Sequence, residues 1–272
     1  MKYSFSCPAT CNYEIMVDAK NDDEALAKIV AEGALHSRKV HPYVLPMTEE
    51  QLKNMVRSGM LKARSAMRLL VGVLLAFWFA LIFVLAVEGA FVRPPQAPPF
   101  PILLGATVPL VVFLVAYQGS EAFRAMVLGA DLRLLTAIQA WRAGGLGFLA
   151  LYAHGVLPGL FAWPAGLGDI AIGITAPWVA LVLIRRPKFA ATPHFVAWNL
   201  FGILDLVVAV STGALSSGFV FGLAGKVTTA PMAQLPLVLI PAYFVPLFVM
   251  FHLAALFQAR RSLLNEAKSL GR

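Results

Sequence analysis

The chain has 272 residues, of which 59% are hydrophobic and 13% charged, and its net charge is +8. Soluble domains contain roughly 45–50% apolar and about 25% charged residues, so this composition excludes an ordinary soluble globular protein. Residues 1–60 hold seven Lys/Arg and eight Asp/Glu, a net of −1, whereas residues 61–272 hold fifteen and six, a net of +9. Because the basic excess belongs to the hydrophobic part, where loops and helix ends meet anionic lipid, we expect no nucleic-acid partner.

Residues 1–60, called the head domain below, are predicted to form a small cytoplasmic domain that begins with two short strands. We expect no signal peptide before it, since residues 1–20 lack a continuous apolar run. Apolar and polar residues alternate in two stretches, which is typical of strands with one buried face. The apolar members are Tyr3, Phe5, Tyr13, Ile15 and Val17.

Two helices are expected after these strands. Asn21, Asp22 and Asp23 offer side-chain caps, and apolar residues then recur at helical spacing up to about residues 36–41. Thr48, with Gln51 three residues later, forms the capping box of a second short helix that is predicted to end near residue 58. The apolar face of the first helix consists of Ala25, Leu26, Ile29, Val30 and Leu35.

Two cysteines and two histidines of the head domain have the spacing of a metal site. Cys7 and Cys11 lie at the turn between the strands, and His36 and His41 lie near the end of the first helix. Two thiolates and two imidazoles can close a tetrahedral Zn²⁺ site, which would support a domain too small for a large core. The alternative is two reduced cysteines and two surface histidines without a metal. A disulfide between the cysteines is not expected in a cytoplasmic domain.

The same residues carry a resemblance. The segments SCPATC (6–11), DDEA (22–25) and HSRKVHP (36–42) resemble a short bacterial domain of unknown function with the same Cys/Cys/His/His order. The resemblance covers residues 1–60 and implies a compact ββα-type domain with no known activity. The rest of the chain resembles uncharacterised bacterial multi-pass membrane proteins, which implies a location in the bacterial inner membrane.

Six apolar segments follow the head domain, each near the roughly 20 residues that cross the hydrocarbon core of a bilayer. We therefore predict an all-α polytopic membrane protein, with a transmembrane domain over residues 61–262 and a short cytoplasmic tail over residues 263–272. The six segments are expected at about 69–87, 102–117, 134–153, 159 or 165 to 184, 195–215 and 235–257.

Basic residues predict the orientation of these segments. Cytoplasmic loops of membrane proteins carry an excess of Lys and Arg. One end of the segments holds Arg93 and Lys226, and the other holds Lys62, Arg64, Arg68, Arg124, Arg133, Arg185, Arg186, Lys188, Arg260, Arg261, Lys268 and Arg272. We expect both termini and the head domain to lie in the cytoplasm.

Ionisable residues inside the membrane are costly, so each is a functional hypothesis by default. Arg142 lies near the middle of the third segment with Gln139 one turn earlier, and Asp169 and Asp205 lie in the fourth and fifth segments. A carboxylate offsets much of the cost of a buried arginine, so we predict that Arg142 pairs with Asp205 or Asp169. Asn199 is expected to form an interhelical hydrogen bond. The pair is either a structural lock between helices or a substrate or proton site.

Several membrane segments contain proline and glycine residues. In the fourth segment they predict a broken or late-starting helix, and in the sixth they predict interruptions of the kind that often mark transporter sites. The glycines of the third segment fit close helix packing instead. The residues concerned are Pro164, Gly166 and Gly168 in the fourth segment, Pro236, Pro241 and Pro246 in the sixth, and Gly144, Gly145 and Gly147 in the third.

These features favour a small-solute or ion transporter, or a channel-like protein, with a polar centre at Arg142 and a regulatory metal-binding head domain. The alternative is a membrane-anchored sensor or scaffold whose head domain binds metal or a cytoplasmic protein, and a homo-oligomer fits either function. An enzyme is disfavoured, because the sequence contains no motif for intramembrane hydrolysis. Haem is disfavoured because His154 and His252 are expected at different depths.

Overall fold

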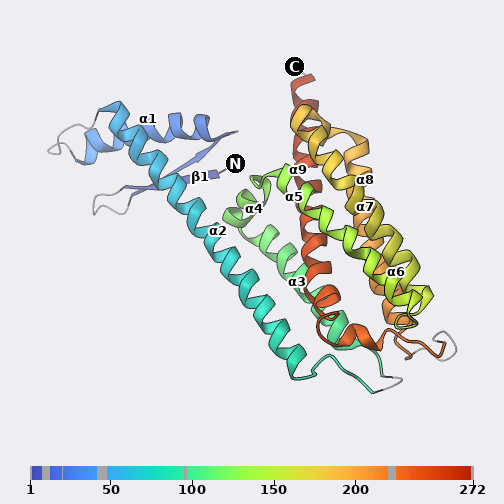
Figure 1. Cartoon of the computed structure of the whole chain (residues 1–272). Coiled ribbons are helices and arrows are strands. Elements are labelled where there is room, and N and C mark those ends of the chain that lie inside the picture. The colour runs from blue at the N-terminus through green and yellow to red at the C-terminus, as the bar shows by residue number, and fades with distance from the viewer. Residues whose placement is uncertain are drawn as a thin grey trace. The chain divides into compact units, whose positions relative to one another are not determined.

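The computed structural model describes residues 2–7, 13–19, 21–41, 48–94, 97–219 and 225–270. Two compact units divide the chain, and helices dominate both (Figure 1). The first unit comprises Met1–Leu74 with Gln118–Met126, and the second comprises Leu75–Tyr117 with Val127–Arg272. Each unit is described by itself.

In the first unit, two strands and two helices enclose a small apolar core. Strands β1 (Lys2–Ser6) and β2 (Glu14–Asp18) pair antiparallel, and helix α1 (Asp22–Val40) follows. The Asn21 side chain accepts a hydrogen bond from the backbone N–H of Glu24, so the predicted cap is confirmed. Leu35 is exposed, so its predicted place on the buried face is wrong. The core consists of Ile15, Ile29, Val30, Leu52 and Val56.

Helix α2 (Glu49–Val87) is a single helix of 39 residues, which corrects the predicted helix end near residue 58. Its start is the predicted capping box: the Thr48 hydroxyl accepts from the Gln51 N–H, and the Gln51 side chain accepts from the Thr48 N–H. The sequence between the capping box and the first apolar segment contains no proline and one glycine, Gly59. Nothing there stops an α-helix, so the head-domain helix continues directly into the first span.

Within the described residues, six helices are long and apolar enough to cross a membrane, which agrees with the predicted number. The first two, in α2 and α3 (Phe100–Gly119), bury few of their apolar side chains, as expected of helices that face lipid. The short helix α4 (Glu121–Leu128) follows α3. The six candidate spans are Met67–Val87, Phe100–Gly119, Leu132–Ala153, Gly159–Arg185, Pro193–Leu215 and Ile240–Leu264.

The third span is regular at both ends and irregular in the middle. It consists of α5 (Leu132–Ala137), the 3₁₀ segment η1 (Ile138–Gly145) and α6 (Leu146–Ala153). A 3₁₀ stretch within a longer helix often marks a hinge or a strained functional segment. The irregular backbone therefore coincides with the part of the span that carries Arg142.

The fourth span is continuous, which corrects the predicted break. Helix α7 starts at Gly159 after an N-cap at Pro158 and runs unbroken to Arg185, past Pro164 and Pro177. Membrane helices tolerate internal proline because neighbouring helices and local adjustments satisfy the freed carbonyls. The short 3₁₀ segment η2 (Pro187–Ala191) then leads to α8 (Pro193–Leu215), the fifth span.

The sixth span begins irregularly, as its prolines predict. A short 3₁₀ segment, η3 (Ala230–Ala233), precedes it, and the π-helical turn η4 (Ile240–Phe244) opens it before α9 (Val245–Leu270). Apolar clusters fill both halves of this bundle. One contains Phe148, Phe161 and Met232, and the other contains Leu183, Phe195 and Ala259.

Candidate functional site

Arg142 occupies the middle of the bundle and is only 3% exposed. It lies ten residues into the span Leu132–Ala153, which corresponds to about 15 Å of helix rise, or half of the hydrocarbon thickness. A guanidinium at this depth has no water to solvate it and requires protein partners.

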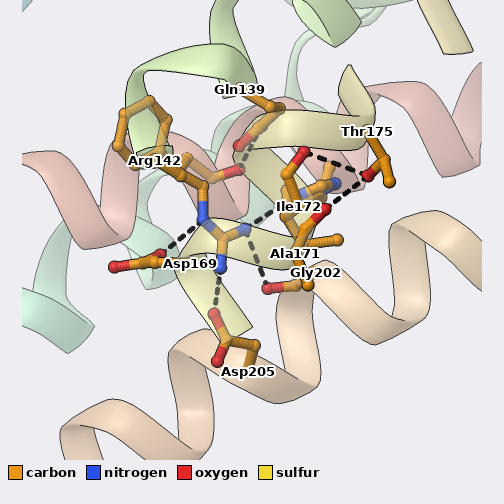
Figure 2. Close-up of polar contacts among 10 residues, drawn as sticks. Gln139, Arg142, Asp169, Ala171, Ile172, Thr175, Gly202 and Asp205 are labelled. Atoms are coloured by element: carbon orange, nitrogen blue, oxygen red, sulfur yellow. Dashed lines mark hydrogen bonds and ion pairs between the residues drawn. The ribbon is translucent and has the colours of Figure 1, made fainter. Parts of the chain in front are cut away.

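Two carboxylates flank this guanidinium (Figure 2). The Nε–H of Arg142 donates to Oδ1 of Asp169 over 2.7 Å, and an Nη2–H donates to Oδ2 of Asp205. The sequence predicted a pair with one aspartate, and the structure pairs Arg142 with both. The side chain of Asp205 is 5% exposed and that of Asp169 is 14% exposed, so the two carboxylates differ in their access to solvent.

The remaining guanidinium nitrogen contacts the fifth and sixth spans. Nη1 lies 3.2 Å from the Gly202 carbonyl oxygen and 3.1 Å from Nε2 of His252. Arginine can only donate hydrogen bonds, so Nε2 must accept and the imidazole is neutral. His252 then donates from Nδ1 to Oδ1 of Asn199 over 2.9 Å, and the Asn199 amide donates to the Phe195 carbonyl. Arg142 therefore connects four spans.

Asn199 and Gln139 extend this group of buried polar residues. Asn199 forms the predicted interhelical hydrogen bond, and its partner His252 brings it into the same network as Asp205. The Gln139 amide donates to the Phe248 carbonyl over 3.4 Å, and its Oε1 is buried without a partner among the described residues. We call Gln139, Arg142, Asp169, Asn199, Asp205 and His252 the Arg142 network.

Glycines make the close approaches within this network possible. A Cβ atom at Gly168 would overlap the carboxylate of Asp205, and one at Gly202 would overlap the imidazole of His252. Among the three glycines of the third span, only Gly145 packs closely, with its Cβ position 3.0 Å from the Gly166 carbonyl. The predicted packing role is wrong for the other two, Gly144 and Gly147, since a Cβ there would meet no atom within 4 Å.

The network contains more acidic than basic groups. One guanidinium faces two carboxylates, and the imidazole is neutral, so the formal sum is −1 with both carboxylates ionised. Of the two carboxylate oxygens of Asp169, only Oδ1 has a hydrogen-bond partner in the described part of the chain. Figure 2 shows the second carboxylate oxygen of Asp169 turned away from the guanidinium. The excess charge is therefore most accessible at Asp169.

A cavity of about 640 Å³ reaches this carboxylate. Its walls come from Phe148 of α6, the second half of α8, the first halves of α3 and α7, and the start of the sixth span. The described residues of the connections 88–99 and 216–239 line its mouth, and they lie at the same end of the bundle in Figure 1. We call this end the cavity end, and the opposite end, with Arg185, Arg186 and Arg260, the basic end. Of the Arg142 network, only Asp169 lines the cavity.

A separate polar cluster lies in the first unit. Ligand atoms of Cys7, His36 and His41 lie within 4.8 Å of one another, and Sγ of Cys7 is 3.8 Å from Nε2 of His41. Tetrahedral zinc ligands lie roughly 3.3–3.8 Å apart, so this arrangement is close to what zinc requires. Cys11, the fourth expected ligand, lies outside the described residues.

The sequence interpretation missed His252 as a member of the network. The different depths of His252 and His154 argue against haem, but they do not bear on a contact between His252 and arginine. A usable signal existed: His252 lies twelve residues into the sixth span, and Asp205 lies twelve residues into the fifth. Residues at equal distance from opposite helix ends meet near the midplane, which places both beside Arg142.

Six apolar spans in the described part of the chain, four of them joined by a buried ion-pair network, define this protein as a multi-pass α-helical membrane protein. Residues 99–260 match the family described as "Domain of unknown function (DUF8737)", and the chain belongs to that family. The match contains Arg142, both aspartates and His252 but excludes the head domain and the first span. No curated protein and no solved structure matches the chain.

Proposed function

We propose that this protein is a small-solute transporter of the inner membrane whose substrate enters the cavity and is bound at Asp169. The observation that carries this proposal is the meeting of the cavity with the Arg142 network at a single, partly exposed carboxylate. A purely structural ion pair needs no cavity. A substrate site near the midplane needs both a route and a charged group.

The orientation of the bundle gives this route a direction. In the orientation favoured by the basic residues, the basic end faces the cytoplasm and the cavity end faces the outside. The network and the apolar cluster of Leu183, Phe195 and Ala255 then separate the cavity from the cytoplasm. The structure corresponds to an outward-open state in this proposal, and transport requires a second state in which the basic end opens.

Cysteine accessibility from the two sides tests this proposal. On a background with Cys7 and Cys11 replaced by Ser, Ala209→Cys in the cavity should react with a membrane-impermeant methanethiosulfonate added outside. Ala255→Cys, buried beyond the network, should react with the same reagent added inside, because the inward-open state exposes it. Reaction of Ala209→Cys alone would identify a closed binding pocket and overturn transport.

The second candidate function is a sensor whose head domain binds zinc. The sensor function is favoured by the cluster of Cys7, His36 and His41, which are three potential metal ligands. A small domain with little apolar core gains stability from a bound metal. In this reading Cys11 supplies the fourth ligand, as the resemblance to the small Cys/Cys/His/His domain implies. A full-length chain that binds solute outside and shows no inward access would favour this candidate.

A further inference from the structure

We propose that the substrate is an amphipathic organic cation, with an apolar body in the cavity and one protonated amine against Asp169. This inference rests on the proposed function, because it requires the cavity to admit solute. It goes further by naming the chemical class of the substrate. The argument comes from the charge of the network, the direction of one carboxylate oxygen and the composition of the cavity wall.

The formal charge of the network favours a cation. Arg142 compensates one carboxylate, and the formal charge that remains with both carboxylates ionised is −1. An isolated charge near the bilayer midplane is costly, so either a proton or a bound monovalent cation is favoured there. An anion would add to the excess, and a neutral molecule would leave it unchanged.

The geometry assigns this cation to Asp169. The Asp205 carboxylate accepts from Arg142 and also packs closely against Gly168. It does not line the cavity. Asp169 lines the cavity, and its Oδ2 turns away from Arg142 (Figure 2). An ammonium N–H can donate to this oxygen without displacing the bond between Arg142 and Oδ1.

The wall of the cavity selects an apolar body rather than a bare ion. Below the mouth, the wall consists mainly of aliphatic and aromatic side chains, including Phe148, Phe161, Leu206, Val210 and Val245. A bound metal cation needs several oxygen ligands, which such a wall does not supply. A cavity of about 640 Å³ falls within the range of pockets that enclose small organic ligands.

The basic side chain at the mouth of the cavity does not neutralise the Asp169 carboxylate. Arg93 lines the mouth, and its exposed side chain can extend toward water and lipid headgroups. Asp169 lies ten residues into α7, about 15 Å of helix rise from that end. Among the described residues, Asp169 forms its ion pair with Arg142 and none with Arg93.

Protection of a cavity cysteine tests the inference. The protein is the full chain with Cys7 and Cys11 replaced by Ser, Ala209→Cys added, in lipid nanodiscs. The probes are 4-phenylbutylamine, 4-phenylbutyrate and 4-phenylbutanol, which share one apolar body and differ in charge. We expect the amine to slow modification of Ala209→Cys by about tenfold, and the acid and the alcohol to slow it less than twofold. Leu204→Cys, which is exposed on α8 and does not line the cavity, is the control for access through lipid.

Asp169→Asn should remove the preference for the amine, because it removes the charge that binds the ammonium group. If this variant does not fold, the comparison of the three probes on the Ala209→Cys protein still decides. Equal protection by all three, or better protection by the acid, would overturn the cation while the accessible cavity remains. Failure of Ala209→Cys to react at all would overturn the accessible cavity, and the proposed function with it.

Discussion

The two polar clusters of this protein are held together by different forces. Cys7, His36 and His41 of the head domain are half-buried thiol and imidazole groups that lie close together. The Arg142 network consists of charged groups that neutralise one another in large part, in a bundle surrounded by lipid. Water can solvate half-buried polar groups in the head domain, whereas a charged cluster at bilayer depth must contain most of its own compensation.

Removal of Arg142 should have the largest effect, because it leaves two buried carboxylates without a cation. Breaking a buried ion pair costs about 3–5 kcal/mol, so we expect Arg142→Ala to lose most of its folded population. The measurement is thermal unfolding of the purified protein in nanodiscs, together with the monodisperse fraction after solubilisation. Arg133→Ala, at an exposed position of the same span, is the matched control and should unfold like the wild-type protein.

An equal effect of Arg142→Ala and Arg133→Ala would contradict the internal compensation of the network. It would show that water reaches the centre of the bundle and solvates the carboxylates. The distinction between the two clusters would then disappear, because both would depend on solvent.

Two glycine substitutions should have the next largest effect. Gly168→Ala places a methyl group against the Asp205 carboxylate, and Gly202→Ala places one against the His252 imidazole. Overpacking of a filled interior costs about 1–3 kcal/mol, so both variants should unfold at lower temperature. Gly147→Ala is the control, since its methyl group would meet no atom within 4 Å. A shift in unfolding temperature as large for Gly147→Ala as for Gly168→Ala would show that the close approaches do not determine stability.

The two aspartates should respond differently to the same substitution. Each Asn variant reduces the formal charge of the network from −1 to zero, which favours the folded state. Asp205→Asn also weakens a charge-assisted hydrogen bond at a fully buried site, and we expect a loss of about 1 kcal/mol. Asp169 is more exposed, so Asp169→Asn should unfold no more easily than the wild-type protein. Greater destabilisation by Asp169→Asn would argue against an excess charge at the cavity.

The position of the network was predictable because charge in an apolar segment is conspicuous in a sequence. Arg142, Asp169 and Asp205 stand out for this reason, and the pairing of arginine with an aspartate follows from the cost of burial. The cavity was not predictable, because its walls are ordinary apolar residues from five spans and two connections. The course of α7 was mispredicted, because proline and glycine signal a break only where neighbouring helices do not satisfy the backbone.

Loss of zinc from the head domain should have the smallest effect on the bundle. If Cys7, His36 and His41 bind zinc, the purified protein should contain about one zinc per chain, and Cys7→Ser should lose most of it. The measurement is elemental analysis by mass spectrometry after removal of loosely bound metal, with His194→Ala, an exposed histidine outside the cluster, as the control. Thermal unfolding of the bundle should change little, because neither Cys7 nor the two histidines belong to the Arg142 network. Equal zinc content in Cys7→Ser and His194→Ala would show that the cluster is not a metal site.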